Sequence, residues 1–179
     1  MKMVRHLTTA ALLVLLGVSS LPGEPPRLQV DHQGPITAVA WSADGQQIVT
    51  ASQGDVIRVL ATSTGKELHR FASGHAVRGI AISADGKMLA LSQDGHGSSF
   101  WKIANGQRQQ SNNYTNYAPE HLAFTPDGQT VMGCDPGQFI KWKMNGGITT
   151  SGGKGGACAA VSPDAVLGAC GDGPGLLRI

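Results

Sequence analysis

Four aspartates recur along the chain at a nearly constant interval, and carboxylates in a regular pattern are natural candidates for acid–base chemistry. Each stands third in a segment reading Ser-Ala-Asp-Gly (twice), Thr-Pro-Asp-Gly or Ser-Pro-Asp-Ala, and the four are Asp44, Asp85, Asp127 and Asp164. An aspartate before a glycine is typical of a tight turn, because the carboxylate bonds nearby backbone amides and glycine adopts positive φ. We therefore give these residues a structural role and predict no catalytic residue.

Other motifs that could perform chemistry are incomplete. Neither Gly-x-Ser-x-Gly nor His-Glu-x-x-His occurs in the chain. The glycine-rich run 152–156 is similar to a phosphate-binding loop around Lys154, but Ile148 stands where the first glycine belongs and Gly155 where Ser or Thr must follow the lysine. We interpret this run as a loop between strands, and we predict neither an enzyme nor a cofactor.

Metal-binding and thiol side chains are few. His96 lies near Asp94 in a glycine-rich turn, but one histidine and one carboxylate do not complete a metal site, and we predict no metal centre. Cys158 and Cys170 are equidistant from Asp164, so a turn at that aspartate would set them opposite each other on adjacent strands. We expect a disulfide between them in an oxidising compartment, unless a one-residue shift of register places them on opposite faces of the sheet.

The first 20 residues have the pattern of a secretory signal peptide. Lys2 and Arg5 precede an apolar run of 12 residues, 7–18, and small residues follow it. This run is shorter than the ~20 residues that span a bilayer, although an uncleaved anchor helix is the alternative interpretation. We expect residues 1–20 to direct export to the periplasm or the extracellular space, and residues 21–27 to form a proline-rich linker.

Without this leader the chain carries no net charge. All 12 acidic residues and 12 of the 14 Lys and Arg residues lie beyond residue 20. A neutral chain gives no electrostatic reason to expect nucleic acid as a partner, and no second apolar stretch is long enough to cross a membrane. Charged residues make up only 15% of the chain and glycine 25 of 179 residues, which favours a folded protein with many turns.

The aspartate turns divide the chain into copies of one unit. They follow one another at intervals of 41, 42 and 37 residues. Each joins two short runs of alternating apolar residues, which predict β-hairpins near 35–52, 77–92, 120–134 and 157–170. A third run follows, with Trp101 and Trp142 at equivalent places 41 residues apart, and a turn and a fourth run complete the unit. We predict units of four antiparallel strands.

This unit resembles the WD40 repeat of β-propeller proteins, and the resemblance covers residues 28–179. It rests on the pairs Asp31-His32 and Gly74-His75 before a first strand, on the aspartate turns and on the two tryptophans. It implies an all-β propeller with four-stranded antiparallel blades, of which this chain supplies three and most of a fourth. Because these blades alone do not close a ring, we expect a fragment of a longer propeller, or self-association that completes the ring.

Members of this family often link His, Ser or Thr, Asp and Trp of one blade in a buried hydrogen-bonded set. The first unit offers His32 and Ser52 but has Leu60 in place of tryptophan, and the second offers His75, Ser92 and Trp101, with Asp94 one position out of place. The third unit offers Trp142, with Cys134 at the serine position. Cys134 and Cys170 match the positions of Ser52 and Ser92, and we interpret all four as small side chains near the ring centre.

The resemblance implies a non-enzymatic scaffold that binds proteins through loops at one face of the propeller, and it names no partner. By position in the repeat and residue type, the candidate contacts are Arg78, Gln93, Asp94, His96 and Asp135, with Tyr114 and Tyr117 in the longest loop between blades. Two alternatives remain. The chain is the propeller part of a secreted enzyme, as in the TolB-like and hydrolase-associated groups, or it is a truncated remnant without independent function.

Overall fold

The described residues of the computed structural model contain fifteen strands and no helix, in four antiparallel sheets. The described ranges are 31–32, 34–54, 56–112, 118–135, 138–152, 158–162, 167–171 and 177–178. The predicted signal peptide 1–20, the linker 21–27 and the start of the repeat at 28–30 lie outside them. Within these ranges no helix is long and apolar enough to cross a membrane. The all-β architecture predicted from the alternating runs is confirmed.

The first two sheets, which we call blades one and two, each have four strands in sequence order. Blade one consists of β1 (Ile36–Trp41), β2 (Gln47–Ser52), β3 (Val56–Ala61) and β4 (Glu67–Ala72). Blade two consists of β5 (Val77–Ile82), β6 (Met88–Gln93), β7 (Gly97–Lys102) and β8 (Gln107–Asn112). The turns between strands hold glycines at positive φ, among them Gly45 at 68° and Gly86 at 69°, as the Asp-Gly pairs require.

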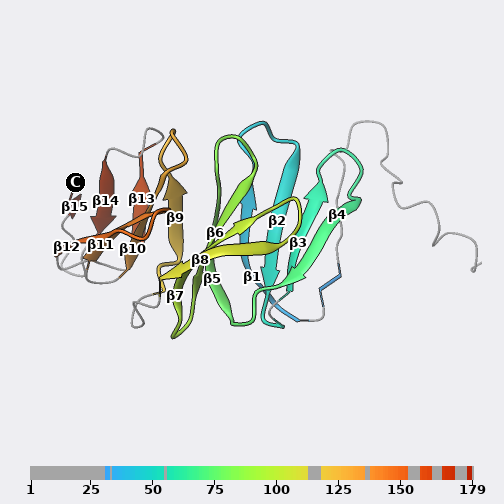
Figure 1. Ribbon diagram of the computed structural model, residues 1–179, viewed down its shortest axis with the longest axis horizontal. Coiled ribbons are helices and arrows are strands. Elements are labelled where there is room, and N and C mark those ends of the chain that lie inside the picture. The colour runs from blue at the N-terminus through green and yellow to red at the C-terminus, as the bar shows by residue number, and fades with distance from the viewer. Residues whose placement is uncertain are drawn as a thin grey trace, which may run out of the picture.

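Blades three and four repeat this plan along the chain. Blade three consists of β9 (His121–Phe124), β10 (Thr130–Asp135), β11 (Gln138–Lys143) and β12 (Ile148–Gly152). Blade four has three strands in the described residues, β13 (Cys158–Val161), β14 (Gly168–Gly171) and β15 (Leu177–Arg178). Figure 1 shows the blades side by side, with blade one on the right and blade four on the left. The first strands of neighbouring blades, β1, β5, β9 and β13, contact one another in that order.

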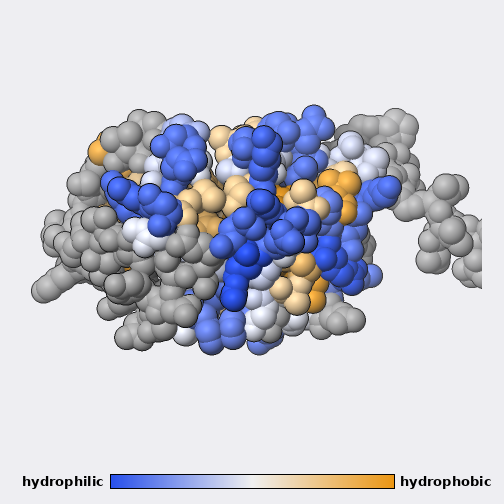
Figure 2. All heavy atoms as spheres, in the orientation of Figure 1, coloured by the Kyte–Doolittle hydropathy of each residue, from blue (hydrophilic) through white to orange (hydrophobic). Residues whose placement is uncertain are grey.

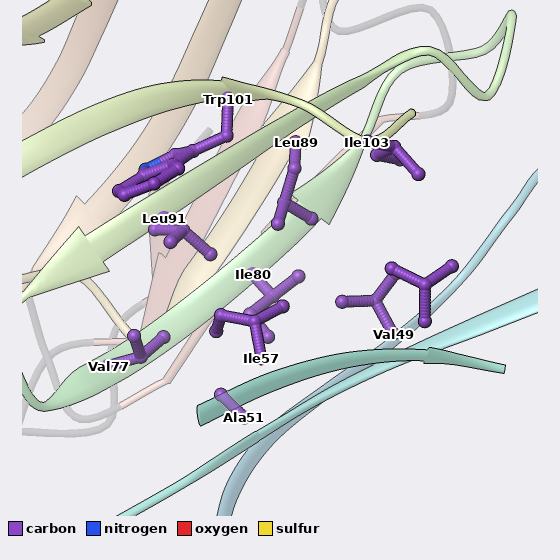
Figure 3. Packing of buried hydrophobic residues seen from close by; sticks show 10 residues of the cluster. Val49, Ala51, Ile57, Val77, Ile80, Leu89, Leu91, Trp101 and Ile103 are labelled. Carbon is purple, nitrogen blue, oxygen red and sulfur yellow. The ribbon is translucent and has the colours of Figure 1, made fainter. Parts of the chain in front are cut away.

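A dry core forms where blades one and two meet. Val49 and Ile57 of blade one face Leu89, Leu91 and Trp101 of blade two, and all five are buried. Figure 3 shows these side chains pointing toward one another from the two sheets. The ring of Trp101 also stacks on Phe71 of β4, with ring centroids 5.5 Å apart. Burial of large apolar side chains from both sheets is the main force that holds neighbouring blades together.

A second core joins blades two and three. Phe100 of β7 lies 6.2 Å from Phe124 of β9, measured between ring centroids, and Trp142 of β11 is buried in the same cluster. Gly133 of β10 makes room for Trp142, because a Cβ at this position would lie 2.7 Å from the indole ring. Each interface is therefore built from the alternate, inward-facing residues of both blades.

The inner strand of blade one leaves large apolar side chains in solvent. Ile36, Val39 and Trp41 are 52%, 60% and 62% exposed, whereas Ala38 and Ala40 between them pack against blade two. In Figure 2 hydrophobic residues (orange) gather over the first blade, and hydrophilic residues (blue) cover the middle of the molecule. One face of β1 thus packs on blade two and the other is open within the described structure.

The turn aspartates bond the way short Asp-Gly turns require. Asp44 Oδ1 accepts hydrogen bonds from Ser42 Oγ at 2.6 Å and from the backbone N–H of Gln46 at 2.9 Å. Asp85 and Asp127 repeat this arrangement in the next two blades. In all three turns the hydroxyl donor, followed by the backbone N–H, lowers the pKa of the aspartate. Asp164 lies outside the described residues.

The register of blade four does not fit the predicted disulfide. Cys158 is paired with Gly171, and Cys170 with Ala159. The two cysteines are therefore one residue out of the register that would set them opposite each other. Because successive residues of a strand face opposite sides, this register places Cys158 and Cys170 at positions on opposite faces of the sheet.

Candidate functional site

The residues that begin the inner strands meet at one end of the blade array. Thr37, Arg78 and Glu120 each stand seven residues before the turn aspartate of their own unit. Because β1, β5 and β9 lie next to one another, these equivalent positions are brought together. We call this end the mouth, and define it by Thr37, Arg78, Glu120, Asp94 and His121.

An ion-pair cluster occupies the mouth. The Arg78 guanidinium donates to Asp94 Oδ2 through Nη2 at 2.9 Å and through Nε at 3.2 Å. Its Nη1 lies 3.7 Å from Glu120 Oε1. The three side chains are 51%, 53% and 66% exposed, so the cluster lies at the surface and its pairs contribute little to stability. The structure therefore brings together the predicted residues Arg78 and Asp94.

Glu120 was missed by the sequence analysis, although the repeat contains a signal for it. Arg78 is the second residue of β5, and it lies 41 residues after Thr37 and 42 residues before Glu120, which directly precedes β9. A search for charged residues at this one repeat position finds both members of the ion pair.

Close packing of two backbones holds Glu120 in place. Gly79 has no side chain, and a Cβ there would lie 2.5 Å from the carbonyl oxygen of Pro119 and 2.9 Å from that of Glu120. The hydroxyl of Ser92, which is fully buried, donates to the same carbonyl of Pro119. Strand β5 and the segment that enters β9 are therefore locked together directly beneath the Arg78–Glu120 pair.

The mouth borders a cavity of about 630 Å³. Its walls combine apolar side chains with the ion-pair cluster. Its lining includes the apolar residues Ala38, Val39, Val77 and Ile80 and the carboxylates of Asp94 and Glu120. A cleft with apolar walls and a few charged groups at its edge is typical of binding sites.

The two histidines of blade two lie at the same end. His75 and His96 stack with ring centroids 3.4 Å apart and an interplanar angle of 12°. The Nδ1 atom of His96 also lies 2.8 Å from the carbonyl oxygen of Asp94. The stack of His75 on His96 joins the loop before β5 to the turn between β6 and β7, which carries Asp94. In the part of the chain that the structure describes, no group of three or more His, Cys, Asp and Glu residues could hold a metal ion.

Gln93 is a structural residue and not a surface contact, which corrects the sequence analysis. Its side chain is 2% exposed. Its Nε2 donates to the carbonyl oxygen of Ser73 at 3.0 Å, and its Oε1 accepts from Ser99 Oγ at 2.6 Å. Trp101 Nε1 donates to the same Ser99 oxygen at 2.7 Å. These four residues form a continuous buried chain of hydrogen bonds, which we call the blade-two network.

This network replaces the bonded set expected from the family pattern. In blade two, Ser92 bonds Pro119 and His75 stacks on His96, so neither contacts Trp101 through a hydrogen bond that the structure describes. Ser99 was not predicted. Its signal is its place two residues before Trp101, since residues two apart in a strand face the same side.

Blade one also departs from the predicted pairing. His32 Nε2 lies 2.8 Å from Thr50 Oγ1, and not against Ser52. Burial, followed by the positive charges of Arg58 and Arg70, lowers the pKa of His32. The register pairs Ser52 with the first residue of β1, as it pairs Gln93 with the first residue of β5. Ser52 is therefore the counterpart of Gln93, not of Ser92.

Three further candidate contacts cannot be placed at the mouth. Tyr114 and Tyr117 lie outside the described residues. Asp135 ends strand β10, but its side chain lies outside the described part, as do the side chains of Cys134, Cys158 and Cys170. The remaining predicted contact, His96, is exposed and is bound to the turn of Asp94 as described above.

Four-stranded antiparallel blades that follow one another in sequence define a β-propeller array. A family model described as "WD domain, G-beta repeat" matches residues 23–59, which include most of blade one. Over this part, the chain is similar to WD40 repeat proteins. Solved structures with the same fold include "Structure of U3-55K" and "Crystal structure of RRP9 WD40 repeats", each with a TM-score of 0.64 and 22% identity. They cover 71% of this chain, which in turn covers 42% and 41% of theirs.

Curated relatives include a WD repeat protein. The chain is 30% identical over 122 residues to WD repeat domain-containing protein 83 of Danio rerio, covering 65% of this chain and 38% of that protein. It is 38% identical over 64 residues to Autophagy-related protein 18 of Candida glabrata, covering 34% of this chain and 13% of that protein. The chain thus spans well under half the length of the relatives it matches.

Proposed function

We propose that this chain is a protein-interaction module that binds its partner at the mouth. The observation that carries the proposal is the cluster of Arg78, Asp94 and Glu120 beside a cavity of about 630 Å³. Three charged groups from two blades converge there on apolar walls, which is the composition of a recognition surface. Similarity to a repeat family whose blades present loops and strand ends supports a scaffold role in preference to catalysis.

The rigidity of this surface supports the same function. Asp94 is held by the stacked histidines, Glu120 by the packing of Gly79 on Pro119, and the strands beneath them by the blade-two network. A surface whose groups are already in place loses little conformational entropy when a partner binds. The backbone segments that carry the charged groups of the mouth are therefore held in place.

A comparison of captured proteins tests this site. The full chain, a triple variant with alanine at Thr37, Arg78 and Glu120, and a Lys87→Ala control are immobilised, and proteins that bind each are identified by mass spectrometry after cross-linking. Lys87 follows the turn at the other end of β5 and is 80% exposed, so it removes a charge far from the mouth. We expect at least one protein retained by the full chain and the control and lost from the triple variant. Identical sets on all three would overturn the proposal.

We also propose that the module belongs to an exported protein, on the signal-peptide pattern of residues 1–20. The sequence of the N-terminus of the mature protein tests this, because cleavage near residue 20 is expected and an intact Met1 contradicts it. Self-association that completes the ring stays a prediction, and the exposure of Val39 and Trp41 on β1 supports it. Light scattering of the purified chain, with Trp41→Ser as the variant, measures it.

A further inference from the structure

We propose that the mouth accepts a basic side chain, a lysine or an arginine, from the partner. This inference rests on the function proposed above and adds the chemical class of the group that is recognised. Three features support it: the balance of charge at the rim, the apolar walls and the position of Arg78.

The charge balance at the rim is negative. Among the described residues that border the cavity, two carboxylates, Asp94 and Glu120, share the single guanidinium of Arg78. Both carboxylates are more than half exposed, at 53% and 66%, so solvent and a ligand reach them. One cation between two anions leaves about one unit of negative charge at the rim, which attracts a second cation.

The walls suit the rest of a basic side chain. Lysine and arginine have long aliphatic stems, which pack on apolar surface while the charged head stays at a polar edge. The cavity lining includes Val39, which is 60% exposed and offers the apolar surface, beside the buried side chains of Val77 and Ile80, and it includes both carboxylates. An aliphatic stem along these walls would carry its charge to Asp94 and Glu120.

An acidic side chain fits this site poorly. Among the described residues that line the cavity, its cationic partner at neutral pH is Arg78, whose guanidinium already lies 2.9 Å from Asp94 and 3.7 Å from Glu120. A new carboxylate would have to displace one of these two and would then face both as like charges. Charge complementarity therefore favours a basic group.

Two peptide libraries test the inference. Both consist of fluorescein-labelled heptapeptides with the same random flanks, one with Lys or Arg at the centre and the other with Asp or Glu. Binding to the full chain is measured by fluorescence anisotropy at low salt. We expect tighter binding of the basic library and a loss of affinity with added salt.

Variants at the rim should shift the affinity in opposite directions. Each of Glu120→Gln and Asp94→Asn removes an anion and should weaken binding of the basic library by about two- to fivefold, the usual range for an exposed ion pair. Arg78→Gln removes the competing cation and should strengthen it by a similar factor. Lys87→Gln, which removes the same charge at the opposite end, should leave it unchanged.

The outcomes separate this inference from the proposed function. The basic-group inference is overturned if the full chain binds the acidic library more tightly, or if Arg78→Gln binds the basic library more weakly than the full chain does. In either case the mouth remains a binding site. Basic binding that Glu120→Gln and Asp94→Asn leave unchanged places the peptide elsewhere and also overturns it. If neither library binds and the triple variant still loses its captured protein, docking at the mouth stands and the basic-group inference fails.

Discussion

Blades one and two use the same repeat positions in opposite ways. In blade two, Trp101, Ser99 and Gln93 bond one another and end on the carbonyl oxygen of Ser73, with every side chain of the set at most 7% exposed. The corresponding positions of blade one hold Leu60, Arg58 and Ser52, with His32 on the segment before the strand. Both sets are enclosed, but only the first consists of groups that complement one another.

The blade-one set leaves polar atoms unsatisfied. Within the described residues, Ser52 Oγ, Arg58 Nε and His32 Nδ1 are buried without a hydrogen bond, and Arg58 has only a 3.6 Å ion pair with Glu67. In blade two the buried hydroxyl of Ser98 also lacks a hydrogen bond within the described residues, but it lies outside the blade-two network. A buried polar group without a partner costs about 1–3 kcal/mol. We infer from this difference that blade two, which carries Arg78 and Asp94, is the rigid support of the mouth and that blade one is the weaker sheet.

Replacing Trp101 by leucine should have the largest effect on stability, because it places in blade two the residue type that blade one has at the equivalent position, Leu60. The change removes the stack on Phe71 and the donor to Ser99. We expect the free energy of unfolding to fall by about 2–4 kcal/mol, measured by urea denaturation. Trp41→Leu is the matched control, since Trp41 is 62% exposed, and it should change stability by less than about 0.5 kcal/mol. Equal losses from both variants contradict this account.

The second prediction compares equivalent positions directly. Gln93→Leu leaves the carbonyl of Ser73 without its buried donor and should cost about 1–3 kcal/mol of unfolding free energy. Ser52→Ala removes a hydroxyl that is 1% exposed and makes no hydrogen bond with the described residues, so stability should stay the same or rise. Denaturation of both variants under identical conditions is the test, and a larger loss from Ser52→Ala would reverse the comparison.

A third, smaller effect is the pH dependence of blade one. The pKa of His32 is lowered by burial and by Arg58 and Arg70, with Glu67 acting in the opposite direction. The unfolded chain therefore binds the proton more readily than the folded one, and the stabilisation from neutral His32 is full above about pH 6.5. It is lost as the pH falls through the lowered, folded-state pKa. Unfolding free energies from pH 8 to pH 5 should decline more in the native chain than in His32→Gln, and parallel curves would exclude this role.

The smallest effect belongs to the exposed turn aspartates of the first three blades. Their hydroxyl partners lower the pKa of Asp44, Asp85 and Asp127, so the stabilisation is full above about pH 3.9 and is lost as the pH falls through the folded-state values. Asp85→Asn should flatten the decline of stability below pH 4 slightly. The same flattening is expected from Asp44→Asn, because these turns do not differ between the blades. Acid titration of unfolding free energy measures both.

Local patterns predicted the strands and turns well, because alternation and Asp-Gly pairs act within a few residues. The hairpin around Asp85 and the third strand that ends near Trp101 are at the predicted places. Partners across strands were predicted less well. Ser52 was aligned with Ser92, yet the register sets it opposite Ile36, as Gln93 is opposite Val77.

The correspondence of Ser52 with Gln93 was already in the sequence, because each lies eight residues after the turn aspartate of its own unit. The register shift after the first residue of the first strand occurs in both blades and leaves this correspondence unchanged. At the mouth, Arg78 was identified by residue type, but its pair with Glu120 depends on the approach of two blades at Gly79. A contact between blades depends on residues of both blades, so the sequence of one repeat alone does not specify it.

Amide hydrogen exchange of the native chain and of Gln93→Leu tests whether blade two is the rigid support of the mouth and blade one the weaker sheet. In the native chain we expect slower exchange in β6 and β7 than in the equivalent strands β2 and β3. In the variant we expect this difference to narrow, because exchange in blade two becomes faster. Equal rates in the two blades of the native chain, or slower exchange in blade one, would contradict it.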